Sequence, residues 1–215
     1  VVAKGFWLKY GHAELLRSAG YHVMVFDLNG FGESTNTNMD YPLDVLAAGQ
    51  KLNDLFPELP IGLLGASMGA AMSVCAMSQP KHPFKAAVLE SAFPTLLHFW
   101  SRYPVPKLGI QFSQVVYPKG ERQLRPVYAA ENLIGTPSLL MVYGDADIYT
   151  PIKDGLLLRD ALRQKTETEF WTVPGAEHTH AYRAQPKQYS NRVVDFFDRK
   201  LAESKNSLLS QGNSF

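Results

Sequence analysis

The turn Gly65-Ala66-Ser67-Met68-Gly69 constrains the fold of this chain more than any other stretch. The apolar residues 60–64 before it predict a short buried strand, and the small residues 70–77 after it predict a helix. A serine between two glycines at a strand-to-helix turn is held in a strained conformation that exposes its hydroxyl above the sheet. Side chains in place of the glycines would collide where the strand folds back onto the helix. Ser67 is therefore predicted to be a nucleophile.

Further apolar runs and helical patterns alternate along the rest of the chain. Strands are expected at residues 21–27, 84–91, 138–143 and 168–173. Helices are expected at residues 12–19, 43–56, 152–164 and 193–201, with a frayed polar tail from residue 202. Alternating strands and helices predict right-handed crossovers and a mostly parallel sheet flanked by helices, which is an α/β fold.

Length and composition limit the classes to which the chain can belong. Its 215 residues suit a single domain over residues 1–215. A net charge of +1 favours neither nucleic acid nor an anionic membrane as a partner, and no apolar run is long enough to span a bilayer. Because Cys75 is the only cysteine, the chain has no internal disulfide and no cysteine-based zinc cage. This composition favours the cytoplasm, but an upstream signal or anchor stays open because the sequence begins at Val1 rather than methionine.

Residues 94–137 interrupt the alternation of strands and helices. They are rich in aromatic residues and prolines and carry a basic patch at residues 119–125. We expect a small helical insertion that covers the site, rather than a second domain. The aromatic residues Phe93, Phe99 and Trp100 either pack the interior or form the wall of a substrate pocket, and the sequence leaves both interpretations open.

The loops after two of the predicted strands carry the partners that a serine nucleophile needs. In parallel sheets, functional groups gather beyond the carboxyl ends of the strands. An activated serine requires a base and a carboxylate that orients the base. Asp145 and Asp147 follow the strand at 138–143, and His178 and His180 follow the strand at 168–173. Either acid and either histidine fit this order, although aspartate is also a common turn former.

Other chemistries fit the sequence less well. Two acids and two histidines could indicate a metal site, but His-x-His without a third ligand is a weak signal of one. We expect no metal and no cofactor. The glycine-rich stretches lack the third glycine of a dinucleotide fingerprint and the lysine of a phosphate-binding loop. Asp27 is expected to organise its loop, and Glu90 is expected to make a structural hydrogen bond, with a role in the pocket left open.

Five motifs together resemble the α/β-hydrolase superfamily, in particular bacterial serine hydrolases of the acyl-aminopeptidase, lysophospholipase and esterase type. The motifs are DLNGFGES, GASMG, LESAF, YGDADIYTP and PGAEH, and the resemblance runs from about residue 20 to about residue 201. It implies that Asp147, three residues after Gly144, is the triad acid, and that His178 is the base. It also implies that the main-chain N–H of Met68 is one donor of the oxyanion hole.

The resemblance implies a serine hydrolase that cleaves a carboxylic ester, a thioester or a small amide through an acyl-enzyme intermediate. A non-catalytic binding protein with the same fold and an acyltransferase are the alternatives. The partner is a small acyl substrate, and the oligomeric state stays open. The family also has a strand that ends in His-Gly about twenty residues before the position of Gly20. Residues 1–6 carry Lys4 instead of that histidine, so we expect this strand upstream of Val1, and the second oxyanion donor is unassigned.

Overall fold

A parallel sheet forms the centre of the computed structural model, which describes residues 2–35, 40–100, 104–116 and 125–212. Within these ranges the sheet has four strands in the order β1-β2-β3-β4, so each strand lies beside its neighbour in sequence. The strands are β1 (Ile61–Ala66), β2 (Phe84–Glu90), β3 (Ser138–Gly144) and β4 (Thr168–Val173). All three pairings are parallel, so the carboxyl ends of the strands lie at one edge.

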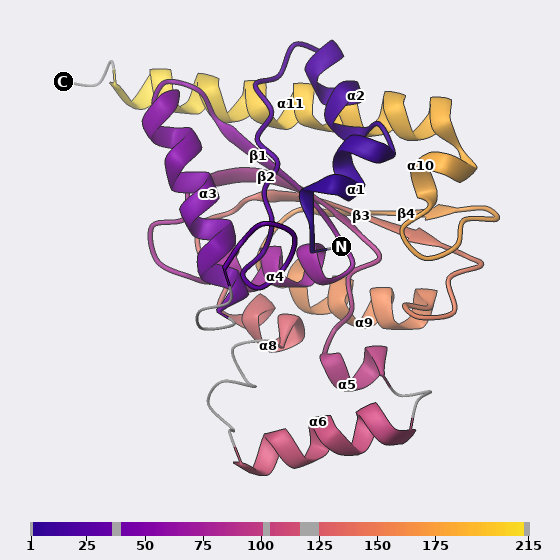
Figure 1. Cartoon of the computed structure of the whole chain (residues 1–215). Helices are drawn as coiled ribbons and strands as arrows, with labels where there is room; N and C mark the ends of the chain where they lie inside the picture. The colour runs from indigo at the N-terminus through magenta and orange to yellow at the C-terminus, as the bar shows by residue number, and fades with distance from the viewer. Residues whose placement is uncertain (1, 36–39, 101–103, 117–124, 213–215) are drawn as a thin grey trace.

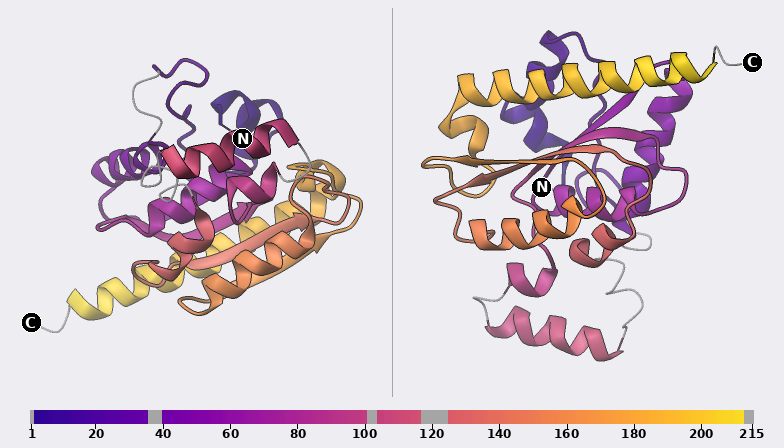
Figure 2. Two further views of the ribbon diagram at one scale, coloured as in Figure 1. Left: turned by 90° about the horizontal axis from the view of Figure 1, so that it is seen from below. Right: turned by 180° about the vertical axis from the view of Figure 1, so that it is seen from behind.

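Helices cover both faces of this sheet, as Figures 1 and 2 show. The described helices are α1 (Lys4–Lys9), α2 (His12–Ser18), α3 (Tyr41–Leu55), α4 (Met68–Met77), α5 (Leu96–Phe99), α6 (Pro104–Val116), α8 (Pro126–Glu131), α9 (Ile152–Arg163), α10 (Ala181–Ala184) and α11 (Pro186–Gly212). The long helix α11 lies on one face together with α1 and α2, and α4, α8 and α9 lie on the other.

Two apolar clusters pack against the two faces. Side chains alternate along a strand, so Ala87 and Leu89 of β2 join the cluster beneath α4, whereas Ala86 and Val88 join the cluster beneath α11. Both sets are fully buried. This two-sided burial explains why β2 has a mostly continuous apolar run rather than an alternating pattern.

Apart from the C-terminal helix, which runs from Pro186 to Gly212 instead of over residues 193–201, the predicted helices and strands are found with small changes of boundary, with one exception. Residues 21–27, predicted to be a strand, have no regular secondary structure. A strand needs a hydrogen-bonded neighbour, and among the described residues no other strand lies against this segment. The apolar pattern therefore identified a segment suited to a sheet, but pairing decides whether a strand forms.

The C-terminal helix is longer than the sequence predicts. A frayed tail was expected from residue 202, but α11 continues to Gly212, so this prediction is wrong for residues 202–212. Lys200 lies 3.2 Å from Glu203 one turn later, a pair that favours continuation of the helix. None of the helices in the described ranges combines the length and apolar character that crossing a membrane requires.

The described parts of residues 94–137 are helical and comprise α5, α6 and α8. Helix α6 contacts α5 and extends away from the sheet in Figure 1. Residues 101–103 and 117–124 lie outside the described residues, and they include all of the predicted basic patch except Arg125. That this segment forms a covering insertion stays a prediction.

The side chain of His12 is buried among aromatic rings at the start of α2. Its ring stacks on Phe6 and meets the rings of Trp7, Tyr182 and Tyr189. Neither ring nitrogen has a hydrogen-bond partner among the described residues. Burial lowers the pKa of His12 from 6.5 to about 4, because protonation would place a charge in an apolar environment.

We expect His12 to make the protein less stable as the pH falls from about 6.5 to about 4. In this window the unfolded chain binds a proton at His12 and the folded chain does not, so acid favours unfolding. A pKa difference of about 2.5 corresponds to about 3 kcal/mol of unfolding free energy. Urea unfolding of His12→Phe and the unchanged protein at pH 7.5 and pH 4.5 measures this loss. An equal loss in both proteins would show that His12 is not its source.

Candidate active site

Ser67 occupies a strained turn between β1, which ends at Ala66, and α4, which begins at Met68. Its φ of 53° lies in the left-handed region that residues other than glycine rarely adopt. The N–H of Ser67 donates to the carbonyl of Glu90 at 2.8 Å, which fixes the turn to the neighbouring strand. A Cβ atom on Gly65 would lie 2.8 Å from the main chain of Ala70, so the close approach of strand and helix requires glycine there.

Two hydrogen bonds connect the predicted nucleophile, base and acid. The Nε2 atom of His178 lies 2.8 Å from the Oγ atom of Ser67. The Nδ1 atom of His178 lies 2.8 Å from the Oδ2 atom of Asp147. With Nδ1 protonated and bound to the carboxylate, Nε2 is free to accept the hydroxyl proton of Ser67. The structure thus brings together three side chains that are far apart in the sequence.

Asp147 is held by several donors besides His178. Its Oδ1 atom accepts from the main-chain N–H groups of Tyr149 and Thr150 at 2.8 and 2.9 Å. Its Oδ2 atom accepts from the hydroxyls of Thr150 and Ser91 at 2.5 and 3.0 Å. Burial alone would raise the pKa of Asp147, but the hydrogen bonds and charge of His178 and the donors of Thr150 outweigh burial and lower it. The carboxylate therefore stays ionised at neutral pH.

The other acid and the other histidine on these loops have different neighbours. Asp145 accepts the N–H of Gly175 at 2.6 Å and so connects the two loops as a turn residue. His180 lies 3.5 Å from the carboxylate of Glu177. In the structure, His178 rather than His180 reaches Ser67, and Asp147 rather than Asp145 reaches the imidazole.

Glu90 is a buried carboxylate at the end of β2 that holds the loop after His178. It accepts the N–H of Ala181 at 3.0 Å and the hydroxyl of Tyr189 at 2.9 Å. Burial raises the pKa of Glu90 against the opposing effect of these two donors. This position agrees with the structural hydrogen bond predicted from sequence. Asp27, by comparison, accepts the N–H groups of Lys4 and Glu33, as a loop organiser would.

We expect Glu90→Ala to lower the free energy of unfolding by about 2–6 kcal/mol. The change leaves the N–H of Ala181 and the hydroxyl of Tyr189 buried without an acceptor, at about 1–3 kcal/mol for each group. Urea unfolding at pH 7.5 measures the loss. Glu177→Ala is the matched control, because its exposed side chain lies on the same loop, and we expect a change within about 0.5 kcal/mol. Equal losses in both variants would contradict the role given to Glu90.

The aromatic residues predicted to be either packing or pocket differ in their surroundings, and a pocket role stays a prediction. Phe93 is buried in the core and its ring lies 5.2 Å from that of Phe99. The ring of Phe99 is partly exposed and lies 5.7 Å from His178, with Trp100 packed edge-on against it. Tyr149, which sequence reasoning did not single out, lies 5.4 Å from the ring of His178. Phe99 and Tyr149 thus border the imidazole, whereas Phe93 contacts Phe99 from the core.

Sequence reasoning assigned no role to two hydroxyl residues that hold the acid, Ser91 and Thr150. Ser91 has a φ of 52°, and its Oγ atom also lies 3.4 Å from the N–H of Thr179, so it bridges two loops. For the Asp147 turn a signal was present, because an aspartate in a turn commonly accepts from the main-chain N–H two residues on, here that of Tyr149, but it does not identify the hydroxyl of Thr150. No comparable signal exists for Ser91, whose contact with Asp147 depends on strand order.

Met68 begins α4, and its role as an oxyanion donor stays a prediction. Its main-chain N–H has no hydrogen-bond partner within the helix, and the helix N-terminus favours negative charge. Across the described ranges, no group of three or more histidine, cysteine and acidic side chains could hold a metal ion.

Comparisons with known proteins give a family match and similar folds. A model of the prolyl oligopeptidase family (peptidase S9) matches residues 7–204. An esterase from Pyrococcus furiosus is 21% identical, with a TM-score of 0.72 over 91% of this chain and 77% of the esterase. An acylaminoacyl peptidase from Pyrococcus horikoshii is 24% identical, with a TM-score of 0.59 over 74% of this chain and 28% of the peptidase. No curated protein sequence matches the chain. The structural matches confirm the predicted α/β-hydrolase fold.

Proposed function

The chain belongs to the prolyl oligopeptidase family of serine hydrolases, and from this premise we propose that it cleaves a carboxylic ester, thioester or small amide through an acyl-enzyme. We assign Ser67 as the nucleophile, His178 as the general base and Asp147 as the acid that orients it. The observation that carries this assignment is the unbroken series of hydrogen bonds from Ser67 through His178 to Asp147, with both distances at 2.8 Å.

The reaction divides into two acyl transfers. The Oγ atom of Ser67 attacks the carbonyl carbon, and its proton passes to Nε2 of His178. The imidazolium then gives that proton to the leaving alcohol, thiol or amine as its bond to carbon breaks. A water molecule repeats the sequence on the acyl-enzyme, which releases the acid and restores the hydroxyl. In both steps the N–H of Met68 donates to the oxygen that becomes negative.

The surroundings of the imidazole support an apolar acyl or aryl group as the part of the substrate that is bound. The rings of Phe99 and Tyr149 lie 5.9 Å apart, and each borders His178. Aromatic rings contribute a large apolar contact area at little cost in side-chain entropy. We therefore propose substrates whose acyl side is apolar rather than charged.

A fluorophosphonate probe tests the proposal, because it reacts with an activated serine hydroxyl. We expect one covalent adduct per chain, located on Ser67 by mass spectrometry of the digested protein. Ser67→Ala should abolish the adduct. Ser73→Ala is the matched control, since Ser73 lies on α4 and its hydroxyl donates to Gly69 rather than to a base. Absence of labelling, together with no turnover of p-nitrophenyl acyl esters, would instead favour a non-catalytic binding protein.

A further inference from the structure

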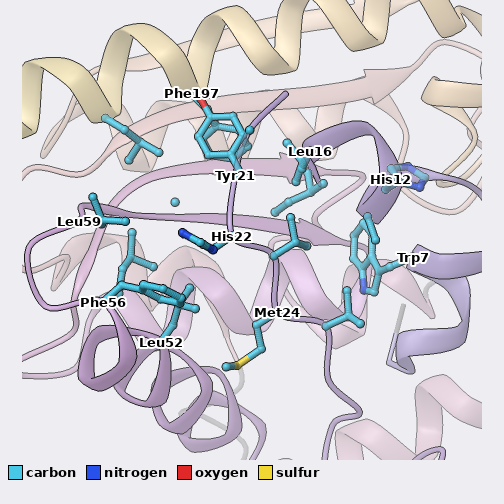
Figure 3. A pocket seen from close by; sticks show the side chains of 18 of the residues that line it. Trp7, His12, Leu16, Tyr21, His22, Met24, Leu52, Phe56, Leu59 and Phe197 are labelled. Atoms are coloured by element: carbon cyan, nitrogen blue, oxygen red, sulfur yellow. The ribbon is translucent and has the colours of Figure 1, made fainter. Parts of the chain in front are cut away.

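Apolar side chains gather on two different kinds of surface in the described chain. One is a cavity of about 340 Å³ beside β1 and residues 20–26. The side chains that line it, among them Leu16, Leu52 and Phe56, are half-buried by their neighbours in the domain (Figure 3). The other is a convex face of α6, where the apolar side chains are surrounded by solvent.

Helix α6 directs one apolar side away from the protein. Five of its apolar side chains are between 62% and 80% exposed, and no other large apolar side chain in the described ranges is more than 59% exposed. The five are Val105, Leu108, Phe112, Val115 and Val116, which we call the α6 face. Their spacing of three, four, three and one residues places them on one side of the helix. Surface helices normally turn their apolar side toward the core, so this face is suited to a partner outside the domain.

The position of α6 leaves this face accessible to an extended partner. In both views from the side, α6 is the element farthest from the sheet, beyond α5 and α8 (Figures 1 and 2). It contacts α5, whose Phe99 borders His178, so α6 lies on the side of the domain that bears the candidate active site. A convex helix of this kind cannot enclose a small molecule, but it can lie flat against a broad surface.

The charge of the sequence around α6 favours an anionic partner. Residues 101–125 contain five lysine and arginine residues and one glutamate, a net charge of +4 in a chain whose total is +1. The other residues together therefore carry a net charge of −3. Lys107 lies within the helix, Arg102 two residues before it and Lys119 three residues after it. The near-neutral total, which by itself favours no anionic partner, conceals this asymmetry.

An anionic lipid surface fits both the apolar face and the charge. Helices that lie in a lipid interface combine an exposed apolar side with lysine and arginine residues that attract anionic headgroups. A second copy of the chain fits less well, because two α6 faces in contact would bring together two segments that each carry a net charge of +4.

We propose that the α6 face binds an anionic lipid surface, with its apolar side chains in the boundary between headgroups and acyl chains. Helix α6 lies in the plane of this boundary rather than across the bilayer, because it has 13 residues and a span needs about 20. The proposal concerns binding alone and does not depend on the hydrolase activity proposed above.

Sedimentation of the protein with lipid vesicles tests the proposal. We expect vesicles of about 70% phosphatidylcholine and about 30% phosphatidylglycerol to bind the protein at least about tenfold more tightly than vesicles of phosphatidylcholine alone. In about 0.5 M NaCl this difference should largely disappear, because salt screens the attraction. No binding to either kind of vesicle, or equal binding to both, would overturn the proposal.

A double variant, Leu108→Gln with Phe112→Gln, removes two apolar side chains from the α6 face. Glutamine is a good helix former, so circular dichroism should be unchanged. We expect the affinity for the anionic vesicles to fall at least about tenfold. The matched control is Leu55→Gln with Leu157→Gln, which changes two exposed leucines on α3 and α9 and should bind within about twofold of the unchanged protein. Equal losses in the two double variants would overturn the proposal.

A third variant, Lys107→Gln, tests the contribution of charge. We expect it to bind the anionic vesicles about fivefold more weakly and the neutral vesicles with unchanged affinity. An equal change on both kinds of vesicle would contradict the attraction to anionic headgroups.

Two further results would assign the α6 face differently. If Leu108→Gln with Phe112→Gln bound the anionic vesicles as tightly as the unchanged protein, and salt released both, charge alone would account for the binding. If light scattering without lipid showed dimers that the same double variant dissociates, the face would belong to a second copy of the chain. Either result would overturn the proposal.

Discussion

Ser67→Ala is expected to reduce kcat for a p-nitrophenyl acyl ester by roughly 10⁴- to 10⁶-fold. The residual hydrolysis would proceed without an acyl-enzyme intermediate. The side chain removed is the one whose oxygen lies 2.8 Å from Nε2 of His178, so the variant lacks the hydroxyl that the base would activate. Steady-state kinetics with active-site titration measure the effect. The substitution shortens a nearly buried side chain by one atom, and circular dichroism should be unchanged.

Ser73→Ala serves again as the control and should retain activity within about twofold, because its hydroxyl bonds only within α4. A Ser67→Ala protein that keeps more than about a tenth of the activity would show that another residue performs the attack.

Asp147→Asn is expected to lower kcat by roughly 10³- to 10⁴-fold with little change in KM. The amide can donate to Nδ1 of His178, which would place the imidazole proton on Nε2 and prevent it from accepting the proton of Ser67. A profile of kcat against pH should show no recovery of activity between pH 6 and 9, since asparagine does not ionise. Labelling by the fluorophosphonate should slow by a comparable factor.

Asp145→Asn is the matched control for Asp147, because it lies two residues earlier on the same loop and accepts a main-chain N–H rather than the imidazole. We expect less than about a tenfold change in kcat. If Asp145→Asn were the more damaging of the two, the choice between the acids would be wrong.

The strands that could be predicted are those whose apolar runs are paired in the final sheet. Residues 84–91 and 138–143 were recognised because burial on both faces leaves a nearly continuous apolar signature, and each has a neighbour at hydrogen-bonding distance. Residues 21–27 have the same signature and form no strand. The residue types in a segment indicate how well it suits a sheet. A strand also requires a neighbouring strand to which it can hydrogen-bond, and the local sequence does not reveal that neighbour.

The candidate site was predictable to the extent that its groups follow strands. The order of serine, acid and histidine could be read from the loops after three apolar runs, and the choice of Asp147 and His178 required resemblance to a known family. The structure agrees with that choice in its contacts, while the catalytic roles stay predictions. The contact between Ser91 and Asp147 could not be read from sequence, because it depends on the adjacency of β2 and β3.

The contact between Gly144 and Ala176 has a consequence for how the protein loses its activity on heating. A Cβ atom at Gly144 would lie only 1.9 Å from the carbonyl oxygen of Ala176, and the N–H of Ala146 bonds that same oxygen at 3.1 Å. The loop that bears the carboxylate and the loop that bears the imidazole are thus held together by main-chain contacts. The distance between the two loops should stay constant until the whole domain unfolds. Thermal inactivation and global unfolding should therefore coincide rather than occur in two stages.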